Sequence, residues 1–309
     1  ASISPQVGAQ TYPTKPLRLI VPFAPGGPND VIGRVVAQKV TEQIGQTVVV
    51  DNRPGAGGAI GTALAANAPA DGYTLLISGT SSLAINPALY KKLPYDPLGD
   101  FAPVSLVGTA PSLLVVTPSL PVKTIKDLIA LAKAKPGQIN YASGGIGSAP
   151  HLAGELLNSM AGIKMVHIPF KGGGPSLTAV MSGQVHLFMG GMSAAMPPAK
   201  DGRLRGIAVT SPKRSQFMPD VPTIAESGVP GFDVVNWYAI FAPAATPKAI
   251  ISRLNSEIVK AMAAPEIRKR FAALATDADT STPAELGAYH RSEIKKWAQV
   301  VKTAGIKPE

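Results

Sequence analysis

The sequence predicts an α/β fold arranged in two lobes, and three observations support this fold class. Short apolar runs typical of buried strands alternate with runs of helical periodicity. The alternation starts again with new elements after about residue 118, and glycine-rich loops stand where strands lead into helices. Such alternation is typical of mostly parallel sheets with right-handed crossovers.

The first three strand-and-helix units are expected within about the first 80 residues. Residues 17–22 (LRLIVP) form a β-branched apolar run, as in a strand buried on both faces. Residues 30–44 carry apolar side chains at helical spacing and stop before Gly45, a residue type that favours a helix C-terminus. Further strands are expected at 47–50 and 74–77, separated by a loop at 53–58 and a small-residue helix that ends near Asn67.

The rest of the chain is expected to build the second lobe and then return to the first. Residues 101–118 are predicted as two extended segments around Gly108, and Thr124 with Asp127 forms a capping box. The remaining expected strands are 139–142, 165–169, 185–189, 206–210 and 233–242, and the expected helices are 124–135, 148–161, 175–182, 247–263, 265–274 and 283–304.

The last three expected helices follow one another without new strands, so they should pack on a sheet already formed. The chain should therefore cross between the lobes twice, near residues 107–112 and near 223–240. We expect lobe 1 to comprise residues 1–109 with 226–309, and lobe 2 to comprise residues 110–225.

Composition narrows the class of protein. The 309 residues are 45% hydrophobic and 16% charged, as in a globular protein. The 29 Lys and Arg residues exceed the 19 Asp and Glu residues by 10, but the excess is scattered, which argues against nucleic acid as a partner. A diffuse positive field would attract anionic solutes, although the charge could equally serve only solubility.

Metal, cofactor and disulfide chemistry find no support in the sequence. There is no cysteine, and the four histidines are too far apart to form a metal pattern. His151 and Glu155 are four residues apart on one expected helix, a spacing that more often gives a local hydrogen bond than a metal site. We therefore expect neither a metal nor a cofactor.

The start of the chain is compatible with export. It begins at Ala1 without a basic segment followed by an apolar stretch, as a mature protein does after loss of its signal peptide, although an arbitrary start would look the same. No apolar run approaches the roughly 20 residues that span a bilayer.

Two glycine-rich loops carry the strongest functional signal. Loop 1 (residues 23–30, FAPGGPND) and loop 2 (residues 141–151, YASGGIGSAPH) each leave a strand and open a helix, where free N–H groups and the helix dipole attract anions. Because the loops belong to different lobes, we expect them to hold one anion from two sides; as the alternative, each is only a well-built turn. The residues concerned are Phe23, Pro25, Gly26, Gly27, Asn29 and Asp30 in loop 1, with Asn29 and Asp30 as helix caps, and Ser143, Gly144, Gly145, Gly147, Ser148 and His151 in loop 2.

A third loop and two aromatic residues add candidates for the same cleft. In loop 3 (residues 169–176, PFKGGGPS), Phe170 could form a wall and Gly172 could offer its N–H group, whereas Lys171 is expected in solvent. Trp237 and Tyr238 lie in the extended run at the second crossover, where one could form the cleft floor while the other packs in the core.

Nucleotide and hydrolase motifs are missing. No Gly-Lys-Ser or Gly-Lys-Thr of a P-loop occurs, no dinucleotide fingerprint has its acidic partner, and no Gly-x-Ser-x-Gly elbow is present. An enzyme in this cleft would lack a recognisable nucleophile, metal cage or acid–base pair. Binding without catalysis is therefore the expected function.

At these residues the chain resembles a known family over nearly its whole length. It is similar to the periplasmic solute-binding proteins of the tripartite tricarboxylate transporters, the Bug or TctC family. The motifs that carry the resemblance are Tyr12-Pro-x-Lys-Pro-x-Arg18, Phe23-Ala-Pro-Gly-Gly27, Asp51-Asn-Arg-Pro-Gly-Ala-Gly-Gly58, Ala70-Asp-Gly-Tyr-Thr-Leu-Leu76, Asn86-Pro87, Asp100-Phe-x-Pro-Val104, Tyr141-Ala-Ser143, Gly147-Ser148, His151-Leu-Ala-Gly-Glu155, Pro169-Phe-Lys-Gly172, Trp237-Tyr238 and Phe241-Ala-Pro243.

The resemblance implies a two-lobed Venus-flytrap binding protein of type II with two crossover strands. Such a protein is monomeric and periplasmic, closes on a small organic carboxylate, and presents it to the permease subunits of a membrane transporter. Loop 1 and residues 143–148 of loop 2 would hold one ligand carboxylate through backbone groups and water. Ser78 and Thr80, after the third strand, are implied as further ligand-binding residues. A carboxylate sensor would use the same binding chemistry, and an enzyme acting on a carboxylate is the more distant alternative.

Three positions depart from the family pattern. Asn29 stands where Thr is common, and His186 and Gly190 stand where Asp is common. Loss of an acid at 190 would remove an anion from the pocket and leave space. Our hypothesis is a carboxylate ligand without an ammonium group, most simply a dicarboxylate, with room for a bulky or aromatic body between Phe23, Phe170 and Trp237.

Overall fold

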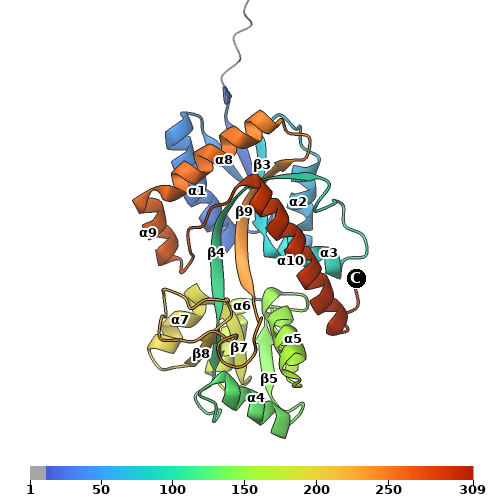
Figure 1. The fold of residues 1–309 in the computed structure, drawn as a ribbon, viewed down its shortest axis with the longest axis vertical. Helices are drawn as coiled ribbons and strands as arrows, with labels where there is room; N and C mark the ends of the chain where they lie inside the picture. Colours follow the sequence, from blue (N-terminus) through green and yellow to red (C-terminus); the bar gives the residue numbers. More distant parts are fainter. Residues whose placement is uncertain (1–11, 309) are drawn as a thin grey trace, which may run out of the picture.

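The computed structural model describes residues 12–308, which form two α/β lobes joined by long strands (Figure 1). Within these residues the strands make one nine-stranded sheet in the order β2-β1-β3-β9-β4-β7-β5-β6, with β8 paired to β4. The strands are β1 Leu17–Val21, β2 Val48–Asn52, β3 Thr74–Gly79, β4 Phe101–Val116, β5 Asn140–Ser143, β6 Val166–Pro169, β7 Leu187–Gly191, β8 Arg205–Val209 and β9 Val235–Pro243.

Helices cover both faces of the sheet in each lobe (Figure 1). Lobe 1 contains α1 Pro28–Ile44, η1 Ala56–Gly58, α2 Ala59–Ala66, the π-helical turn η2 Thr80–Ile85, α3 Asn86–Leu89, α8 Lys248–Ala263, α9 Pro265–Ala273 and α10 Pro283–Thr303. Lobe 2 contains α4 Ile125–Ala134, α5 Ala149–Ala161, α6 Gly173–Met181 and α7 Met192–Lys200.

Strand β4 connects the lobes by changing partners along its length. Its first part, Phe101 to Pro111, pairs antiparallel with β9, and its second part, Ser112 to Val116, pairs antiparallel with β7 and β8. The expectation of two separate extended segments at 101–118 is therefore wrong, because both halves find partners without a break in the strand. The residue boundaries that we expect for the two lobes stay a prediction.

The parallel strands of each lobe agree with the predicted α/β class. In lobe 1, β1 pairs parallel with β2 and β3; in lobe 2, β5 pairs parallel with β6 and β7. Local signals are also confirmed: Thr124 and Asp127 make both capping-box hydrogen bonds at α4, and Gly45 ends α1 in the left-handed conformation.

The core consists of three clusters that follow this architecture. One lies in lobe 1 between the sheet and α1, α8 and α9, and another lies in lobe 2 around Val115, Phe188 and α7. The largest spans both lobes, joining Trp237 and Trp297 of lobe 1 to Tyr141 and Leu152 of lobe 2. The lobes therefore share buried apolar surface along one side of the hinge strands.

Gly79 is required where β3 approaches β9. It is paired opposite Tyr238, and a Cβ added to it would overlap the carbonyl oxygen of Trp237. Its backbone is extended, so the requirement for glycine is steric and not conformational.

We expect Gly79→Ala to lower the free energy of unfolding by about 1–3 kcal/mol or more, because the methyl group must push two paired strands apart. Urea denaturation measures the change. Gly174→Ala is the matched control, because nothing lies within 4 Å of a Cβ at residue 174. Equal stability of the two variants would contradict the close packing of β3 on β9.

Candidate functional site

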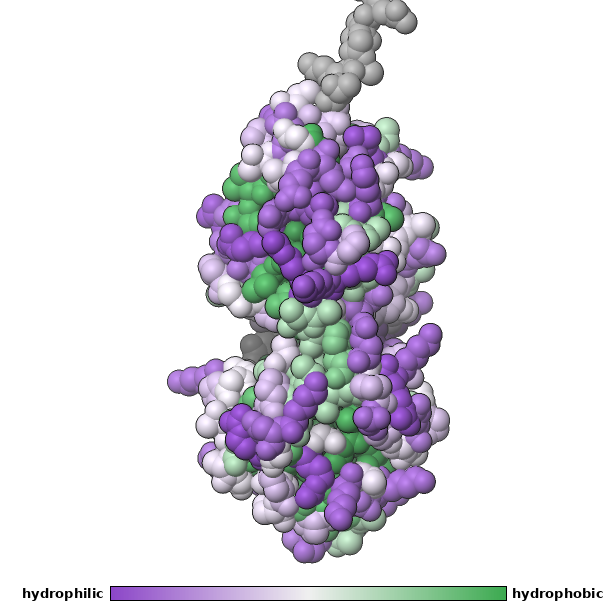
Figure 2. All heavy atoms as spheres, turned by 90° about the vertical axis from the view of Figure 1, so that its left-hand side faces the viewer, coloured by the Kyte–Doolittle hydropathy of each residue, from purple (hydrophilic) through white to green (hydrophobic). Residues whose placement is uncertain are grey.

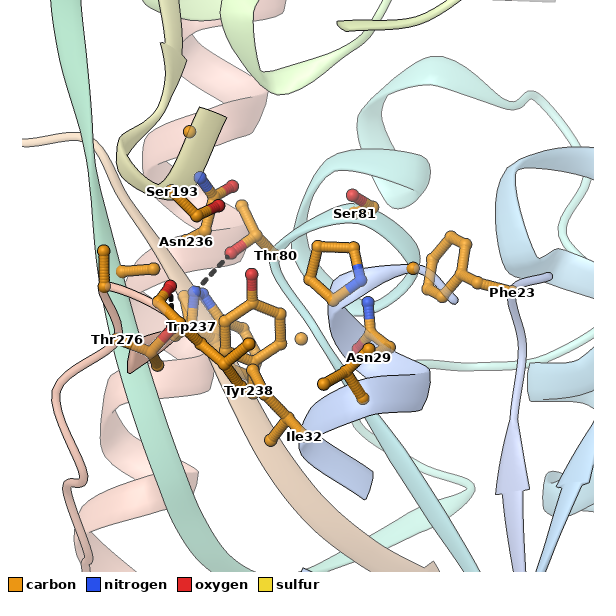
Figure 3. A pocket seen from close by; sticks show the side chains of 18 of the residues that line it. Phe23, Asn29, Ile32, Thr80, Ser81, Ser193, Asn236, Trp237, Tyr238 and Thr276 are labelled. Carbon is orange, nitrogen blue, oxygen red and sulfur yellow. Dashed lines mark hydrogen bonds between the residues drawn. The ribbon is translucent and has the colours of Figure 1, made fainter. Parts of the chain in front are cut away.

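A cavity of about 740 Å³ lies between the lobes beside the hinge strands (Figure 3). Three loops that follow parallel strands form most of its wall: residues 23–29 after β1, residues 79–81 after β3, and residues 191–193 after β7. The remaining wall comes from Val31 and Ile32 of α1, from Ala110 of β4, from Asn236, Trp237 and Tyr238 of β9, and from residues 274–276 between α9 and α10. Figure 2 shows the narrow waist between the lobes, where pale and green residues separate two more hydrophilic surfaces.

Helix N-termini from both lobes meet at this cavity. Helix α1 begins at Pro28 and η2 at Thr80 on the lobe 1 side, and α7 begins at Met192 on the lobe 2 side. The first N–H groups of a helix have no partner inside the helix, and the dipole places partial positive charge there. The cavity thus offers neutral donors to an anion from two sides.

The described lining contains no side chain that is charged at neutral pH. Among the described residues that line the cavity, none is Asp, Glu, Lys, Arg or His. An anion bound here would be held by backbone N–H groups, hydroxyl groups and amides, as at other helix N-termini. The same lining offers no carboxylate to a ligand ammonium group.

Asp30 stabilises the conformation of loop 1 through hydrogen bonds. Its carboxylate is buried and accepts hydrogen bonds from the Gly26 backbone N–H at 2.8 Å, from Arg34 Nε at 2.9 Å and from Asn52 Nδ2 at 2.9 Å. Asn52 Nδ2 also donates to the Phe23 carbonyl. Asp30 therefore holds the middle of loop 1 directly and its first residue through Asn52, and it is not part of the cavity lining.

Asn29, unlike Asp30, lines the cavity. The helix begins two residues earlier than expected, at Pro28 with Gly27 at the N-cap, so the prediction of Asn29 and Asp30 as side-chain caps is wrong. Asn29 lines the cavity, and within residues 12–308 its Oδ1 is buried without a hydrogen-bond partner. Since an amide can present either its oxygen or its N–H groups, Asn29 is well placed to contact a ligand (Figure 3).

Thr80 lies at the cavity surface, whereas Ser78 lies beneath it. Thr80 lines the cavity, and its Oγ1 accepts the backbone N–H of Trp237 at 2.9 Å, which leaves the hydroxyl hydrogen for another acceptor. Ser78 is fully buried and shares a hydrogen bond with Ser82 beneath the turn. A ligand contact from Ser78 stays a prediction.

Tyr238 and Trp237 of β9 point to opposite faces of the sheet, as neighbouring strand residues do, so one faces the cavity and the other the core. The Tyr238 side chain points into the cavity (Figure 3), and burial raises the pKa of its hydroxyl to about 12, so the hydroxyl stays a donor at neutral pH. Trp237 also borders the cavity, but its indole is buried and donates to Glu293. Tyr238 and Phe23 are thus the aromatic rings best placed to form walls.

The residues of lobe 2 that line the cavity were not predicted from the sequence. Gly191, Met192 and Ser193 line the cavity opposite loop 1 and belong to the junction of β7 with α7. The signal existed, because Gly190-Gly-Met-Ser193 follows an expected strand as loops 1 and 2 do. No helix was predicted after it, because α7 contains Pro197 and Pro198 and proline disfavours helix interiors. The other lining residues missed include Ile32, Asn236 and Thr276.

Loop 2 does not line this cavity. Gly147 lies against Leu89 of α3, so close that a Cβ would overlap the leucine side chain. The Gly145 N–H donates to Ser143 Oγ at 3.1 Å, and the Gly147 N–H donates to His151 Nδ1 at 3.0 Å. Ser148 is the N-cap residue of α5, but its hydroxyl donates to the Gly145 carbonyl and makes no capping bond. A direct role for Ser143, Gly144, Gly145, Gly147, Ser148 and His151 in ligand binding stays a prediction.

A pair of neutral histidines supports loop 2. The His151 and His167 rings stack with centroids 3.8 Å apart, and His167 Nε2 shares a hydrogen bond with Ser143 Oγ. Burial lowers the pKa of both histidines to about 4, so neither carries charge at neutral pH. His151 therefore acts as an acceptor for the loop backbone and supplies no positive charge to an anion.

The remaining predicted residues lie in lobe 2 away from the cavity lining. Phe170 packs against the apolar core of lobe 2, and Gly172 lies against the backbone of Gly144. At Gly190 the expectation of open space is wrong, because a Cβ there would overlap the ring of Phe188. The missing acid at 190 is therefore accompanied by an aromatic ring that fills its place.

Within residues 12–308, no cluster of three or more His, Cys, Asp or Glu side chains could bind a metal ion. In the same range, every helix is too short or too polar to cross a bilayer.

Comparison with known proteins agrees with this architecture. A family model described as "Tripartite tricarboxylate transporter family receptor" (TctC) matches residues 32–306. Protein BugT of Bordetella pertussis is 41% identical over 308 residues, covering 99% of this chain and 94% of BugT. The structure of R. palustris Rpa4515 with adipate matches with a TM-score of 0.83 at 36% identity, covering 96% of this chain and all of Rpa4515 (100%). MatC (Rpa3494) from Rhodopseudomonas palustris, with bound malate, matches with a TM-score of 0.78 at 31% identity, covering 94% of this chain and 100% of MatC.

We expect Asp30→Asn to destabilise the protein at neutral pH. Burial alone would raise the Asp30 pKa, but the hydrogen bonds from Arg34, Gly26 and Asn52 outweigh it and hold the pKa below the ordinary value of 3.8. A lowered folded-state pKa stabilises the fold above the unfolded-state pKa, and this contribution is lost as the pH falls through the folded-state pKa. Urea denaturation from pH 7 down to pH ~3 should thus show the difference between wild type and variant shrinking below pH ~4. A difference that stays constant over this range would contradict the role of the carboxylate charge.

Proposed function

The chain belongs to the tripartite tricarboxylate transporter receptor family, TctC, and from this membership we propose that it is a periplasmic solute-binding protein for a small organic carboxylate. The ligand binds between the lobes and is delivered to the permease subunits of a tripartite transporter. The protein works as a monomer and without catalysis.

The single observation that carries the proposal is the cavity at which α1, η2 and α7 begin. Loop 1 contributes Gly26, Gly27 and Asn29 from lobe 1, and Gly191 with Ser193 faces them from lobe 2. A carboxylate that bridges these two groups favours the closed arrangement of the lobes, since it gains donors from both sides only when they approach.

The lining also supports a ligand class. Because no carboxylate side chain reaches the described cavity wall, a ligand ammonium group would lose its water without gaining a partner. Adipate and malate, which are present in structures of two relatives, are dicarboxylates without an ammonium group. We propose a dicarboxylate of this kind, or a bulkier carboxylate whose apolar body lies between Phe23, Ile32 and Tyr238.

A thermal-shift panel of adipate, malate, aromatic carboxylates and amino acids tests the ligand class. A carboxylate at a hundred times its Kd should raise the Tm by ~4 °C, the shift expected for about 2.7 kcal/mol of added stability in a protein of this size. Mass spectrometry should recover the ligand unchanged after incubation. Stabilisation by amino acids but not by dicarboxylates would overturn the ligand class, and a modified ligand would indicate an enzyme.

Gly191→Leu tests the cavity itself. Nothing lies within 4 Å of a Cβ at this residue and its φ is −53°, so leucine fits the backbone but projects into the ligand space. We expect ligand affinity to fall at least about tenfold, while the free energy of unfolding changes by no more than about 1 kcal/mol. Gly174→Leu is the matched control outside the cavity and should bind as wild type. Unchanged affinity in Gly191→Leu would place the ligand elsewhere.

A further inference from the structure

Both tryptophans of the chain donate to one buried carboxylate. Glu293 of α10 is 2% exposed, and its Oε2 accepts the indole N–H of Trp237 and that of Trp297, each at 3.1 Å. Its Oε1 forms an ion pair with Lys296. The sequence contains two tryptophans in all, so this single acid engages every indole in the protein.

A buried charge is a costly way to fill this place in the core. Two charges removed from water lose hydration that their mutual attraction must replace, and apolar residues of similar size often stabilise a core as well. The site is fully bonded, however: Lys296 Nζ also donates to the Asp233 carbonyl at 3.2 Å. Directional bonds of this kind specify an orientation for the two indoles that apolar contacts leave undefined.

The orientation of Trp237 is transmitted directly to the cavity. Its backbone N–H donates to Thr80 Oγ1, and its carbonyl lies against Gly79, so β9 and the turn after β3 meet at this residue. Its neighbours Asn236 and Tyr238 both line the cavity. A displacement of the buried indole that shifts the Trp237 backbone would therefore move three consecutive residues of the cavity wall.

The same carboxylate also lies where the two lobes are connected. Helix α10 packs against η2 and α3 of lobe 1 and against α5 of lobe 2 (Figure 1). Asp233, which accepts from Lys296, lies on the segment that returns from lobe 2 to β9. Glu293 thus connects the cavity wall at Trp237 to α10, which contacts both lobes, and through Lys296 to the segment that enters β9 from lobe 2.

We propose that Glu293, held by Lys296, is a positioning residue of the binding site. It orients Trp237 and so places residues 236–238 for ligand contact, without touching the ligand. This inference rests on the proposed function for its effect on affinity, whereas its effect on Trp237 is independent of any ligand.

Four variants separate positioning from simple stability. Glu293→Gln keeps the shape but places an amide where the carboxylate met Lys296, and Glu293→Gln/Lys296→Met removes the mismatch so that the amide oxygen can again accept the indoles. Lys296→Met alone leaves the carboxylate without its cation. Glu285→Gln is the control, because Glu285 completes the capping box of the same helix and does not contact either indole.

Three measurements are made on each variant: hydrogen exchange at the Trp237 amide, near-ultraviolet circular dichroism of the ligand-free protein, and affinity for the carboxylate that gives the largest thermal shift. In Glu293→Gln the Trp237 amide hydrogen should exchange faster and the near-ultraviolet spectrum of the indoles should change. The variant should bind the carboxylate about tenfold more weakly. The double variant should recover both spectrum and affinity. Glu285→Gln should unfold at a slightly lower urea concentration, because a capping-box hydrogen bond is lost, with an unchanged spectrum and affinity.

The outcomes distinguish the two proposals. Wild-type protein that binds no carboxylate would overturn the proposed function, and the exchange and spectral data would still decide the positioning role. Unchanged Trp237 exchange and spectrum in Glu293→Gln, or the same loss of affinity in Glu285→Gln, would overturn the role of Glu293.

Discussion

The antiparallel pairing of β4 with β9 is the interaction on which the rest of the structure depends. These two strands carry the chain between the lobes, and β4 continues from its pairing with β9 directly into its pairing with β7 and β8. Because the parallel strands of each lobe are attached to this pair, the ends of β1 and β3 face the end of β7 across a single cavity. The position of the site is thus a consequence of sheet topology.

The chemistry of the site follows from that topology. Loops at the carboxyl ends of parallel strands lead into helices, and helix N-termini supply N–H donors with partial positive charge. The protein can therefore attract an anion without a charged side chain in the described lining, and the ion pair between the buried Asp30 and the exposed Arg34 supports the shape of loop 1 outside the cavity.

Much of the fold and part of the site could be predicted from local patterns. Strand and helix periodicity, the capping box at Thr124 and the glycine after α1 are properties of neighbouring residues, and the structure confirms them. Loop 1 was found for the same reason, since strand, glycines and helix start are adjacent in the chain. Tyr238 and the Gly191–Ser193 wall were harder to assign, because which strand residue faces the cavity depends on register, and the prolines of α7 conceal its helix.

The sequence by itself determined the α/β class, the position of loop 1 between a strand and a helix, and the family, since these depend on short motifs and their order. Only the tertiary structure decided which loop of lobe 2 meets loop 1. In loop 2 the Gly145 and Gly147 N–H groups are already bonded to Ser143 and His151, whereas the residues after β7 line the cavity. It also decided that Phe188 fills the space beside Gly190 and that both indoles share Glu293. The reason is physical: these contacts join residues far apart in the chain, and strand order and helix packing bring them together.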